Sequence, residues 1–378
     1  MTSADAITTQ GALLWEPGTN SGWSVEDIQI DPPSPTEVLI KMAASGLCHS
    51  DDHLDTGDIP LPWAPVLGGH EGAGVVQAVG SEVHDIAVGD HVVTTFLPSC
   101  GRCRWCSAGL GGLCDVGAGV LGGKAPDGTN RIHAQGKPVG AMSFLGTFSP
   151  YVVAPLTSVI PIAADIPLEV AAVIGCAVPT GFGSAVHAAA TQVDDTVVVV
   201  GTGGVGMNAV QGARIAGARY IVAVDPVAYK RERALEFGAT HVAADFDEAM
   251  TVVARLTHGV MADRVILTAS VGLGELVAPC AFLTRKGGVF VMTSAAPALQ
   301  MDVKLNLLDF VMSGKRLQGA LYGSCNARVD VPRLLDLYQD GKLLLDELIT
   351  NEYALSDINK GFADMKAGVN LRGIIRFD

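Results

Sequence analysis

Short apolar runs and amphipathic stretches alternate along the chain from residue 178 to residue 321. Helical patterns separate six runs rich in β-branched residues, which read as buried parallel strands over 197–200, 220–224, 241–244, 264–268, 288–293 and 316–321. Strands and helices in such alternation predict a doubly wound parallel sheet, an α/β fold that binds its ligand at the carboxyl ends of the strands.

The residues on either side of this region show a different pattern. Proline and glycine clusters separate three predicted N-terminal strands, over 12–15, 23–30 and 37–44. Near the C-terminus, Asp330 is predicted to cap a helix that ends at Gly341, and Ser356 to cap one that ends at Gly368. Residues 115–145 lack clear periodicity and predict a long loop that shapes a site or an interface.

A glycine-rich turn, GTGGVG, follows the first of the six strands, and a helical pattern begins at once. The glycines allow a tight turn, close approach of a pyrophosphate, and packing of the helix on the strand, while the helix N-terminus offers free N–H groups. A strand, a turn, a helix and a second strand in this order predict a dinucleotide site rather than an ordinary loop. The predicted contacts in the turn are Gly201, Gly203, Gly204, Val205 and Gly206.

Asp225 ends the second strand, nineteen positions after Gly206. A carboxylate at this place binds both hydroxyls of an adenosine ribose and would repel a 2′-phosphate. The predicted cofactor is therefore NAD.

Four of the eight cysteines lie on one short segment with the spacing C-x2-C-x2-C-x7-C. Four thiolates so close together predict a closed tetrahedral zinc site, formed by Cys100, Cys103, Cys106 and Cys114. An iron–sulfur cluster is the competing interpretation. The bacterial ferredoxin pattern has three residues before its fourth cysteine and a proline after it, whereas here seven residues precede Cys114 and Asp115 follows.

Composition sets the broad class of protein. A chain of 378 residues that is 49% hydrophobic has enough apolar material for two domains. Its net charge of −14 argues against a nucleic acid or an anionic membrane as partner, because both would be repelled. No basic, apolar leader is visible, and no apolar run approaches the ~20 residues that span a bilayer. We expect a cytoplasmic enzyme with a small-molecule substrate.

Three further segments carry residues that can bind metal. Cys48 opens the polar cluster CHSDDHL after an apolar strand, His70 and Glu71 lie between glycines, and Cys176 lies in an apolar, glycine-rich stretch. Taken singly, these are typical of a solvated loop, a surface pair and a small buried side chain.

In this order, Cys48, the GHE triplet, the four-cysteine segment, Cys176 and the glycine turn resemble the zinc-dependent alcohol dehydrogenases of the medium-chain dehydrogenase/reductase family. The resemblance covers nearly the whole chain. GALLWEPGTNSGWSVEDI, AASGLCHSDDHL and FGATH are most similar to the actinobacterial N,N-dimethyl-4-nitrosoaniline-dependent enzymes, the nicotinoproteins. The family implies a GroES-like catalytic domain over 1–177 and 322–378, with a zinc lobe over 98–115. A Rossmann NAD-binding domain over 178–321 would be inserted between the two parts.

The resemblance also implies roles for single residues. The catalytic zinc would be held by Cys48, His70 and Cys176, with one position left for water or the alcohol oxygen. Glu71 would lie behind the metal, and Ser50 with His53 would carry the proton to solvent. Further cofactor contacts would come from Lys230, Arg372 and His49, the last standing where many relatives have arginine. The substrate pocket walls, each of which is equally explained as ordinary core, would be Trp63, Phe96 and Leu121.

The implied activity is hydride transfer from an alcohol to NAD, with two zinc ions per chain and zinc as the Lewis acid. In nicotinoproteins NAD stays bound, and an external acceptor reoxidises it. The alternatives are an ordinary zinc alcohol dehydrogenase with exchanging NAD, a zinc-free reductase of the same superfamily, and a non-enzymatic protein that kept the fold. A homo-oligomer, dimer or tetramer, is expected, with the strand 288–293 pairing across a dimer edge.

Overall fold

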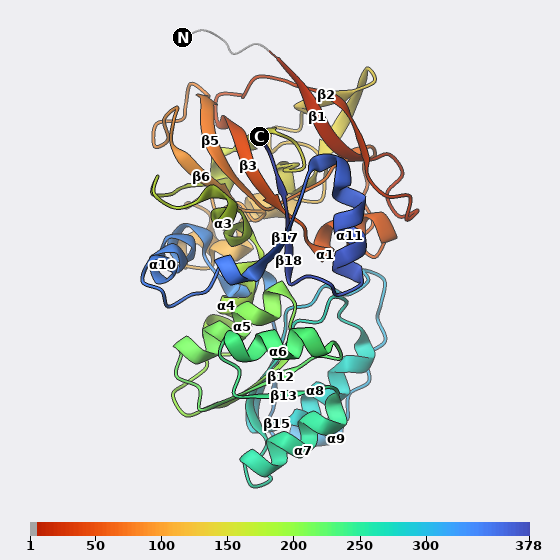
Figure 1. Ribbon diagram of the computed structural model, residues 1–378, viewed down its shortest axis with the longest axis vertical. Helices are drawn as coiled ribbons and strands as arrows, with labels where there is room; N and C mark the ends of the chain where they lie inside the picture. The colour runs from red at the N-terminus through yellow and green to blue at the C-terminus, as the bar shows by residue number, and fades with distance from the viewer. Residues whose placement is uncertain (1–5) are drawn as a thin grey trace. The chain divides into compact units, whose positions relative to one another are not determined.

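The computed structural model describes residues 6–378, which form two compact units (Figure 1). The first unit consists of the chain up to Cys176 together with Asn326–Asp336 and Leu345–Asp378. The second unit consists of Ala177–Cys325 and Leu337–Leu344. This division differs from the predicted bounds in that Ala177 and the segments 322–325 and 337–344 belong to the second unit. Leu344 is bound there by Gln211, whose side chain donates to the carbonyl of Leu344 at 3.0 Å and accepts from its N–H at 2.7 Å.

A closed barrel forms part of the first unit. Its strands, in order around the barrel, are β1 (Ile7–Leu14), β2 (Ser24–Ile30), β7 (Ile132–Ala134), β8 (Lys137–Ala141) and β4 (Val66–Leu67). Alternate residues such as Leu13, Ile28 and Val139 fill its interior. The prediction of one long loop over 115–145 is wrong at β7 and β8, which form an antiparallel hairpin. These strands, of three and five residues, are too short to show a two-residue period in the sequence.

A seven-stranded sheet completes the β structure of the first unit. Its strands are β10 (Val159–Pro161), β6 (His91–Thr94), β5 (Gly72–Val79), β3 (Glu37–Gly46), β18 (Arg372–Arg376) and β17 (Ile349–Tyr353), with β9 (Tyr151–Pro155) also paired to β3. The C-terminal strand β18 lies antiparallel to β3, and β5 lies on the other side of β3 over most of its length. Residues far apart in the chain therefore meet at the end of β3.

The helices that begin in the first unit are α1 (His49–Thr56), α2 (Arg104–Ser107), α3 (Leu168–Ala172), α10 (Ala327–Gln339) and α11 (Ile358–Lys366). Both predicted N-caps are wrong. Asp330 lies inside the first turn of α10, where its carboxylate accepts a hydrogen bond from the N–H of Asn326 at 2.7 Å. A short 3-10 turn, Leu355–Asp357, precedes α11, so Asp357 rather than Ser356 is the cap residue.

The second unit contains a six-stranded parallel sheet, as predicted. Its order is β13 (His241–Ala243), β12 (Tyr220–Val224), β11 (Thr196–Val200), β14 (Ala262–Leu267), β15 (Thr284–Met292) and β16 (Arg316–Gly319). The helices are α4 (Ala177–Gly183), α5 (Gly204–Ile215), α6 (Ala228–Glu236), α7 (Phe246–Leu256), α8 (Val277–Leu283) and α9 (Leu307–Met312). Val198 and Val200 pack with residues of α7 and α8, and strand alternation turns Val197 and Val199 to the opposite face. Burial on both faces explains why the strand is a run of valines.

The expected dimer edge at 288–293 is wrong. These residues belong to β15, which pairs with β14 on one side and β16 on the other, so the outer strand is β16. Within residues 6–378 no single helix is long and apolar enough to cross a membrane. The bent pair Leu168–Gly175 and Ala177–Ala188 meets that test only on length and composition.

Candidate active site

Neighbouring strands bring three side chains of the first unit together. Ser45 of β3 pairs with Gly72 of β5, so Cys48, just after β3, approaches His70 and Glu71, just before β5. Cys176 reaches the same place after α3 and the turn Val173–Gly175. One donor atom each from Cys48, His70, Glu71 and Cys176 lies within 4.8 Å of all the others, and all four residues are buried.

This cluster fits a zinc ion. Tetrahedral zinc with ligand bonds of about 2.0–2.3 Å places its ligands roughly 3.3–3.8 Å apart. Nε2 of His70 is buried and has no hydrogen-bond partner among the described residues, which an ordinary core histidine would need. A hydrogen bond from Cys176, together with the nearby His70, holds the pKa of the Cys48 thiol well below its usual range, although burial opposes this. Thiolate is the form that binds metal.

Asp51 lies beside the other ring nitrogen of His70, and the sequence interpretation missed it. Its Oδ2 lies 3.1 Å from Nδ1 of His70, and its Oδ1 accepts from the N–H of Gly69 at 2.9 Å. Burial alone would lower the pKa of His70, but the charges of Asp51 and Cys48 raise it well above its ordinary value. A carboxylate on the second ring nitrogen is the usual partner of a metal-bound histidine. The only signal in the sequence is an acidic residue three positions after Cys48.

Glu71 and Arg372 form a buried ion pair behind this cluster. Both carboxylate oxygens of Glu71 accept from Nη2 of Arg372, which β18 carries to the end of β3. Burial raises the pKa of Glu71 to about 7, although the Arg372 charge acts in the opposite direction. Gly46 leaves room for the pair, because a Cβ there would lie 2.6 Å from Oε2 of Glu71. The structure thus places Arg372, expected at the pyrophosphate, with part of its guanidinium engaged by Glu71.

Helix α1 carries the residues predicted to move the proton. It begins at His49, and Cys48 is its N-cap. Oγ of Ser50 lies 3.6 Å from Sγ of Cys48. His53 follows one turn later, is 3% exposed, and has its Nδ1 3.0 Å from Oδ2 of Asp58.

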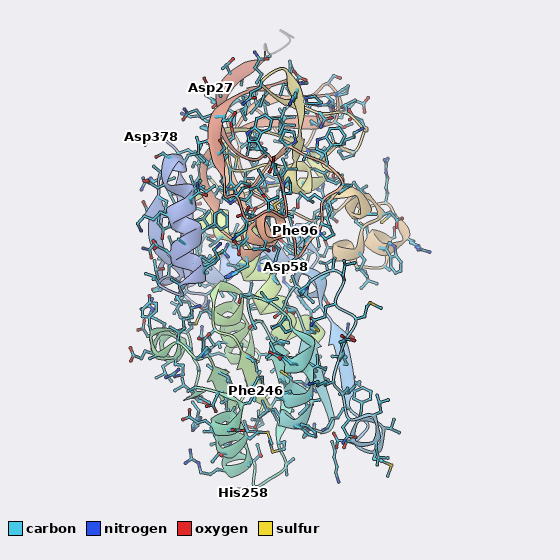
Figure 2. All side chains as sticks on the ribbon, turned by 90° about the vertical axis from the view of Figure 1, so that its right-hand side faces the viewer. Asp27, Asp58, Phe96, Phe246, His258 and Asp378 are labelled. Carbon is cyan, nitrogen blue, oxygen red and sulfur yellow. The ribbon has the colours of Figure 1, made fainter. Side chains whose placement is uncertain are left out.

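Of the three residues predicted to line the substrate pocket, Phe96 contacts a candidate metal ligand. Its ring packs edge-on against His70 with 5.6 Å between ring centroids (Phe96 is labelled in Figure 2). Trp63 packs on Gly123 and Gly140, and Nζ of Lys124 lies 5.0 Å from the centroid of its ring. Leu121 is 40% exposed.

The four-cysteine segment brings its sulfur atoms together in the first unit. Cys100, Cys103, Cys106 and Cys114 each offer one sulfur within 4.8 Å of the others. Backbone N–H groups donate to these sulfurs, for example from Cys103 to Cys100 at 3.4 Å and from Cys106 to Cys103 at 3.5 Å. Such donation, from Cys106 first, lowers the pKa of Cys103 to about 6. Four converging sulfurs with N–H donors fit a closed zinc site.

In the second unit, the glycine turn lies between β11 and α5. Gly201 has a φ of +90°, and a Cβ at Gly206 would lie 1.9 Å from the carbonyl oxygen of Gly201. No side chain caps the N-terminus of α5, so its first N–H groups are available to a phosphate. Nothing described lies within 4 Å of a Cβ built at Gly203, which leaves the approach to the backbone open.

Asp225 is fixed beside this turn. Its two carboxylate oxygens accept from the N–H of Thr202 at 2.8 Å and from the N–H of Val227 at 2.9 Å. Nη1 of Arg231 donates to its carbonyl at 2.6 Å, and half-buried Lys230 lies in the first turn of α6. The carboxylate oxygens keep further lone pairs for ribose hydroxyls.

Comparison with known proteins defines the class. The family model for the alcohol dehydrogenase GroES-like domain matches residues 34–164, and that for zinc-binding dehydrogenase matches residues 204–340. The chain belongs to the zinc-binding alcohol dehydrogenase family, which confirms the predicted GroES-like and Rossmann folds and an alcohol dehydrogenase enzyme. The predicted cofactors, zinc and a nicotinamide dinucleotide, are confirmed with it.

Individual relatives sharpen this comparison. Alcohol dehydrogenase B of Mycobacterium tuberculosis is 50% identical over 372 residues, which cover 98% of this chain and 99% of that protein. The NDMA-dependent alcohol dehydrogenase of Amycolatopsis methanolica is 46% identical over 369 residues, 98% of this chain and 99% of the relative. The crystal structure of benzyl alcohol dehydrogenase from Acinetobacter calcoaceticus superposes with a TM-score of 0.90 at 27% identity, covering 98% of this chain and 100% of that one. The substrate is accordingly a small-molecule alcohol or aldehyde.

Proposed function

We propose that this alcohol dehydrogenase keeps its NAD bound between turnovers, and that an external acceptor reoxidises the cofactor in place. One observation carries the proposal: 46% identity over 98% of the chain to a relative named for its dependence on NDMA, N,N-dimethyl-4-nitrosoaniline. The glycine turn and Asp225 do not decide between retention and exchange, because enzymes that release NAD use the same groups. The alternative is an ordinary zinc alcohol dehydrogenase that binds and releases NAD in each cycle.

The first unit supplies the chemistry in this proposal. Cys48, His70 and Cys176 would hold the catalytic zinc, Asp51 would orient His70, and the four-cysteine segment would hold the second ion. When bound, zinc supplies a Lewis acid for the alcohol oxygen and NAD takes up the hydride. Ser50, whose Oγ lies 3.6 Å from Sγ of Cys48, would pass the hydroxyl proton to His53, which would release it to solvent. The alcohol loses one hydride and one proton and leaves as an aldehyde or ketone.

The proposed cofactor contacts favour NAD over NADP. Two backbone N–H groups hold the carboxylate of Asp225 in place, where it accepts from ribose hydroxyls and repels a 2′-phosphate. Lys230, in the first turn of α6, would serve the same ribose.

Cofactor retention is tested on the purified protein. Retention through extensive dialysis requires a nanomolar dissociation constant or tighter, about −12 kcal/mol. Acid denaturation should then release close to one nicotinamide dinucleotide per chain, and the native protein should oxidise alcohols with the nitrosoaniline dye without added NAD. An Asp225→Ala variant purified in parallel should contain less cofactor. It serves as a control that the assay detects cofactor loss. A wild-type preparation that contains no cofactor and needs free NAD for each turnover would show that the protein is an ordinary zinc alcohol dehydrogenase.

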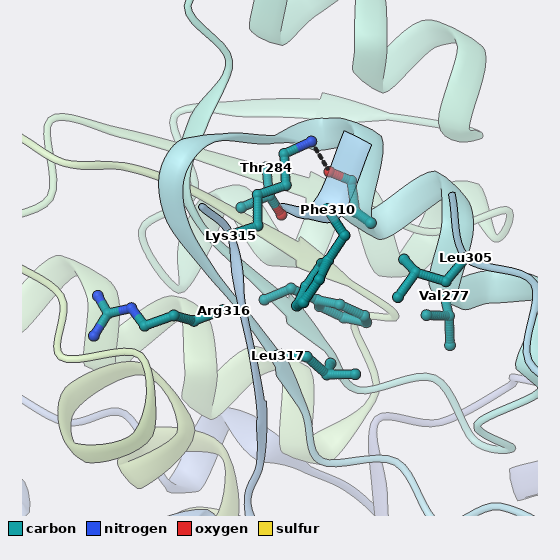
Figure 3. A pocket seen from close by; sticks show the side chains of 9 residues that line it. Val277, Thr284, Leu305, Phe310, Lys315, Arg316 and Leu317 are labelled. Atoms are coloured by element: carbon teal, nitrogen blue, oxygen red, sulfur yellow. Dashed lines mark hydrogen bonds between the residues drawn. The ribbon is translucent and has the colours of Figure 1, made fainter. Parts of the chain in front are cut away.

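The homo-oligomer in our proposal forms through the outer edge of the second unit. Large apolar side chains gather on residues 299–321, where nine are 44–89% exposed: Leu299, Met301, Val303, Leu307, Leu308, Val311, Met312, Leu317 and Leu321. Phe310 and Leu317 line a hollow there with Lys315, whose ammonium donates to the carbonyl of Ala281 at 2.9 Å (Figure 3). So many exposed apolar groups on one segment are typical of an interface.

A second copy of the chain fits this edge best. In the described sheet β16 pairs only with β15, so its outer N–H and C=O groups can pair with the same strand of a partner around a two-fold axis. The segment 299–321 carries three basic and two acidic residues, a formal +1, whereas the whole chain carries −14. Two copies would therefore meet at a segment that lacks the negative charge of the chain as a whole.

The oligomer mass, measured by light scattering after size-exclusion chromatography, tests the interface proposed at residues 299–321. Leu308→Glu should lower the oligomer mass, whereas Val193→Glu, at a position that is 78% exposed elsewhere in the second unit, should leave it unchanged. An unaltered mass in the Leu308 variant, or a wild-type monomer, would contradict this interface.

A further inference from the structure

The turn that follows α1 holds His53 at two points. After Thr56, Gly57 adopts a left-handed φ of +82° and turns the chain back on the helix. The N–H of Ile59 donates to the carbonyl of His53 at 3.1 Å, and Oδ2 of Asp58 lies 3.0 Å from Nδ1 of the His53 ring. Asp58 is labelled in Figure 2. Backbone and ring of His53 are thus both fixed by the two residues after the glycine.

Neighbouring chain segments support this turn. The N–H of Gly18 donates to the carbonyl of Leu54 at 2.9 Å, and a Cβ at Gly57 would lie 3.0 Å from Cα of Gly18. The hydroxyl of Thr56 donates to the same Oδ2 of Asp58 at 3.1 Å. The position of Asp58 is therefore determined by packing and hydrogen bonds and not by the chance approach of two surface side chains.

The acids within α1 have different partners. Asp51 faces His70, Asp52 pairs with Lys366 at 3.1 Å, and the carboxylate of Asp55 accepts from the N–H of Gly22 at 3.1 Å. Asp58, whose side chain is 30% exposed, is left to face the ring of His53, which is 3% exposed. This geometry matches the acid–histidine pairs in which a carboxylate orients an imidazole for proton transfer.

We propose that Asp58 is a positioning residue for the proton relay and sets the tautomer of His53. An ionised carboxylate only accepts hydrogen bonds, so the proton of the neutral ring lies on Nδ1 and the lone pair on Nε2. Nε2 is then the atom that takes up the proton from the substrate side. Ser50 and His53, three residues apart on one helix, lie on the same face, as a relay requires. The inference rests on the proposed role of Ser50 and His53.

A double-mutant cycle tests it, with single-turnover oxidation of an alcohol by the holoenzyme as the assay. His53→Gln should slow turnover by roughly 10²-fold, the lower end for general acid–base catalysis. Asp58→Ala should slow it by about 10-fold, since the base remains but loses its orientation, and Asp58→Glu should restore part of the rate. The double variant should be no slower than His53→Gln, because Asp58 acts only through His53.

Spectroscopy separates positioning from folding. Nitrogen-15 NMR of labelled histidine should show the proton of His53 on Nδ1 in the wild type and a mixture of tautomers in Asp58→Ala. The exposed Asp85→Ala serves as a matched control and should change neither rate nor spectrum. An unchanged rate in His53→Gln would refute the relay itself. A slow His53→Gln with a normal Asp58→Ala, or an equal further loss in the double variant, would refute the role of Asp58 alone.

Discussion

Removing the guanidinium of Arg372 should destabilise the first unit strongly. Glu71 is fully buried and Arg372 is 5% exposed, so Arg372→Leu leaves the buried carboxyl group of Glu71 without its partner. Breaking such a pair from one side costs about 3–5 kcal/mol. In a unit of this size each kcal/mol lowers the melting temperature by about 2–4 °C, so we expect a loss of roughly 6–20 °C in a thermal scan.

The dependence on pH has a defined sign. Burial raises the pKa of Glu71 to about 7, and the charge of Arg372 keeps it from rising further. Removing Arg372 should therefore raise this pKa. A carboxyl group whose pKa is higher in the folded than in the unfolded state binds more protons when folded. Its stabilising effect is present below the unfolded pKa and is lost as pH rises. The deficit of Arg372→Leu should therefore be larger at pH 8 than at pH 5.5.

Two further variants make this prediction refutable. Glu71→Gln combined with Arg372→Leu should recover most of the stability, because no buried charge remains. Arg376→Leu lies on the same strand but removes only exposed pairs with Glu169 and Glu352, so it should cost less than about 1 kcal/mol. Two results would contradict the stabilising role of the ion pair: a melting temperature of Arg372→Leu equal to that of Arg376→Leu, or a double variant no more stable than Arg372→Leu.

Two other predictions concern the bound groups. Cys103→Ser should lower the zinc content from two ions per chain to about one and should lower the melting temperature. The separate cluster that contains Cys48 and Cys176 should keep its ion. A normal metal content in this variant would contradict a structural zinc. Asp225→Ser should weaken NAD binding by roughly 10–100-fold, because it removes a charged hydrogen-bond acceptor, and should narrow the preference for NAD over NADP in equilibrium binding. A variant that still rejects NADP as strongly as the wild type would show that another group excludes the 2′-phosphate.

The features that the sequence predicted well are local ones. The six strands of the second unit and the glycine turn are visible because each is a continuous pattern of a few residues. The hairpin β7–β8 escaped detection, because strands of three and five residues give too few positions for a period to appear. The cap of α10 was misplaced for another reason: Asp330 has the chemistry of a cap residue, but it bonds back to Asn326 from inside the helix.

The partners of the carboxylates around the candidate zinc site could not be predicted from the sequence. Asp51, Asp58 and Glu71 are acids within a stretch of 21 residues, and the sequence interpretation gave a role to Glu71 alone. The fold pairs each with a different base, namely His70, His53 and Arg372. The last pairing joins residues 301 positions apart and exists only because β18 lies along β3. A metal-ligand motif can therefore be recognised from spacing, whereas the base that each carboxylate faces depends on sheet pairing and on the turn after α1.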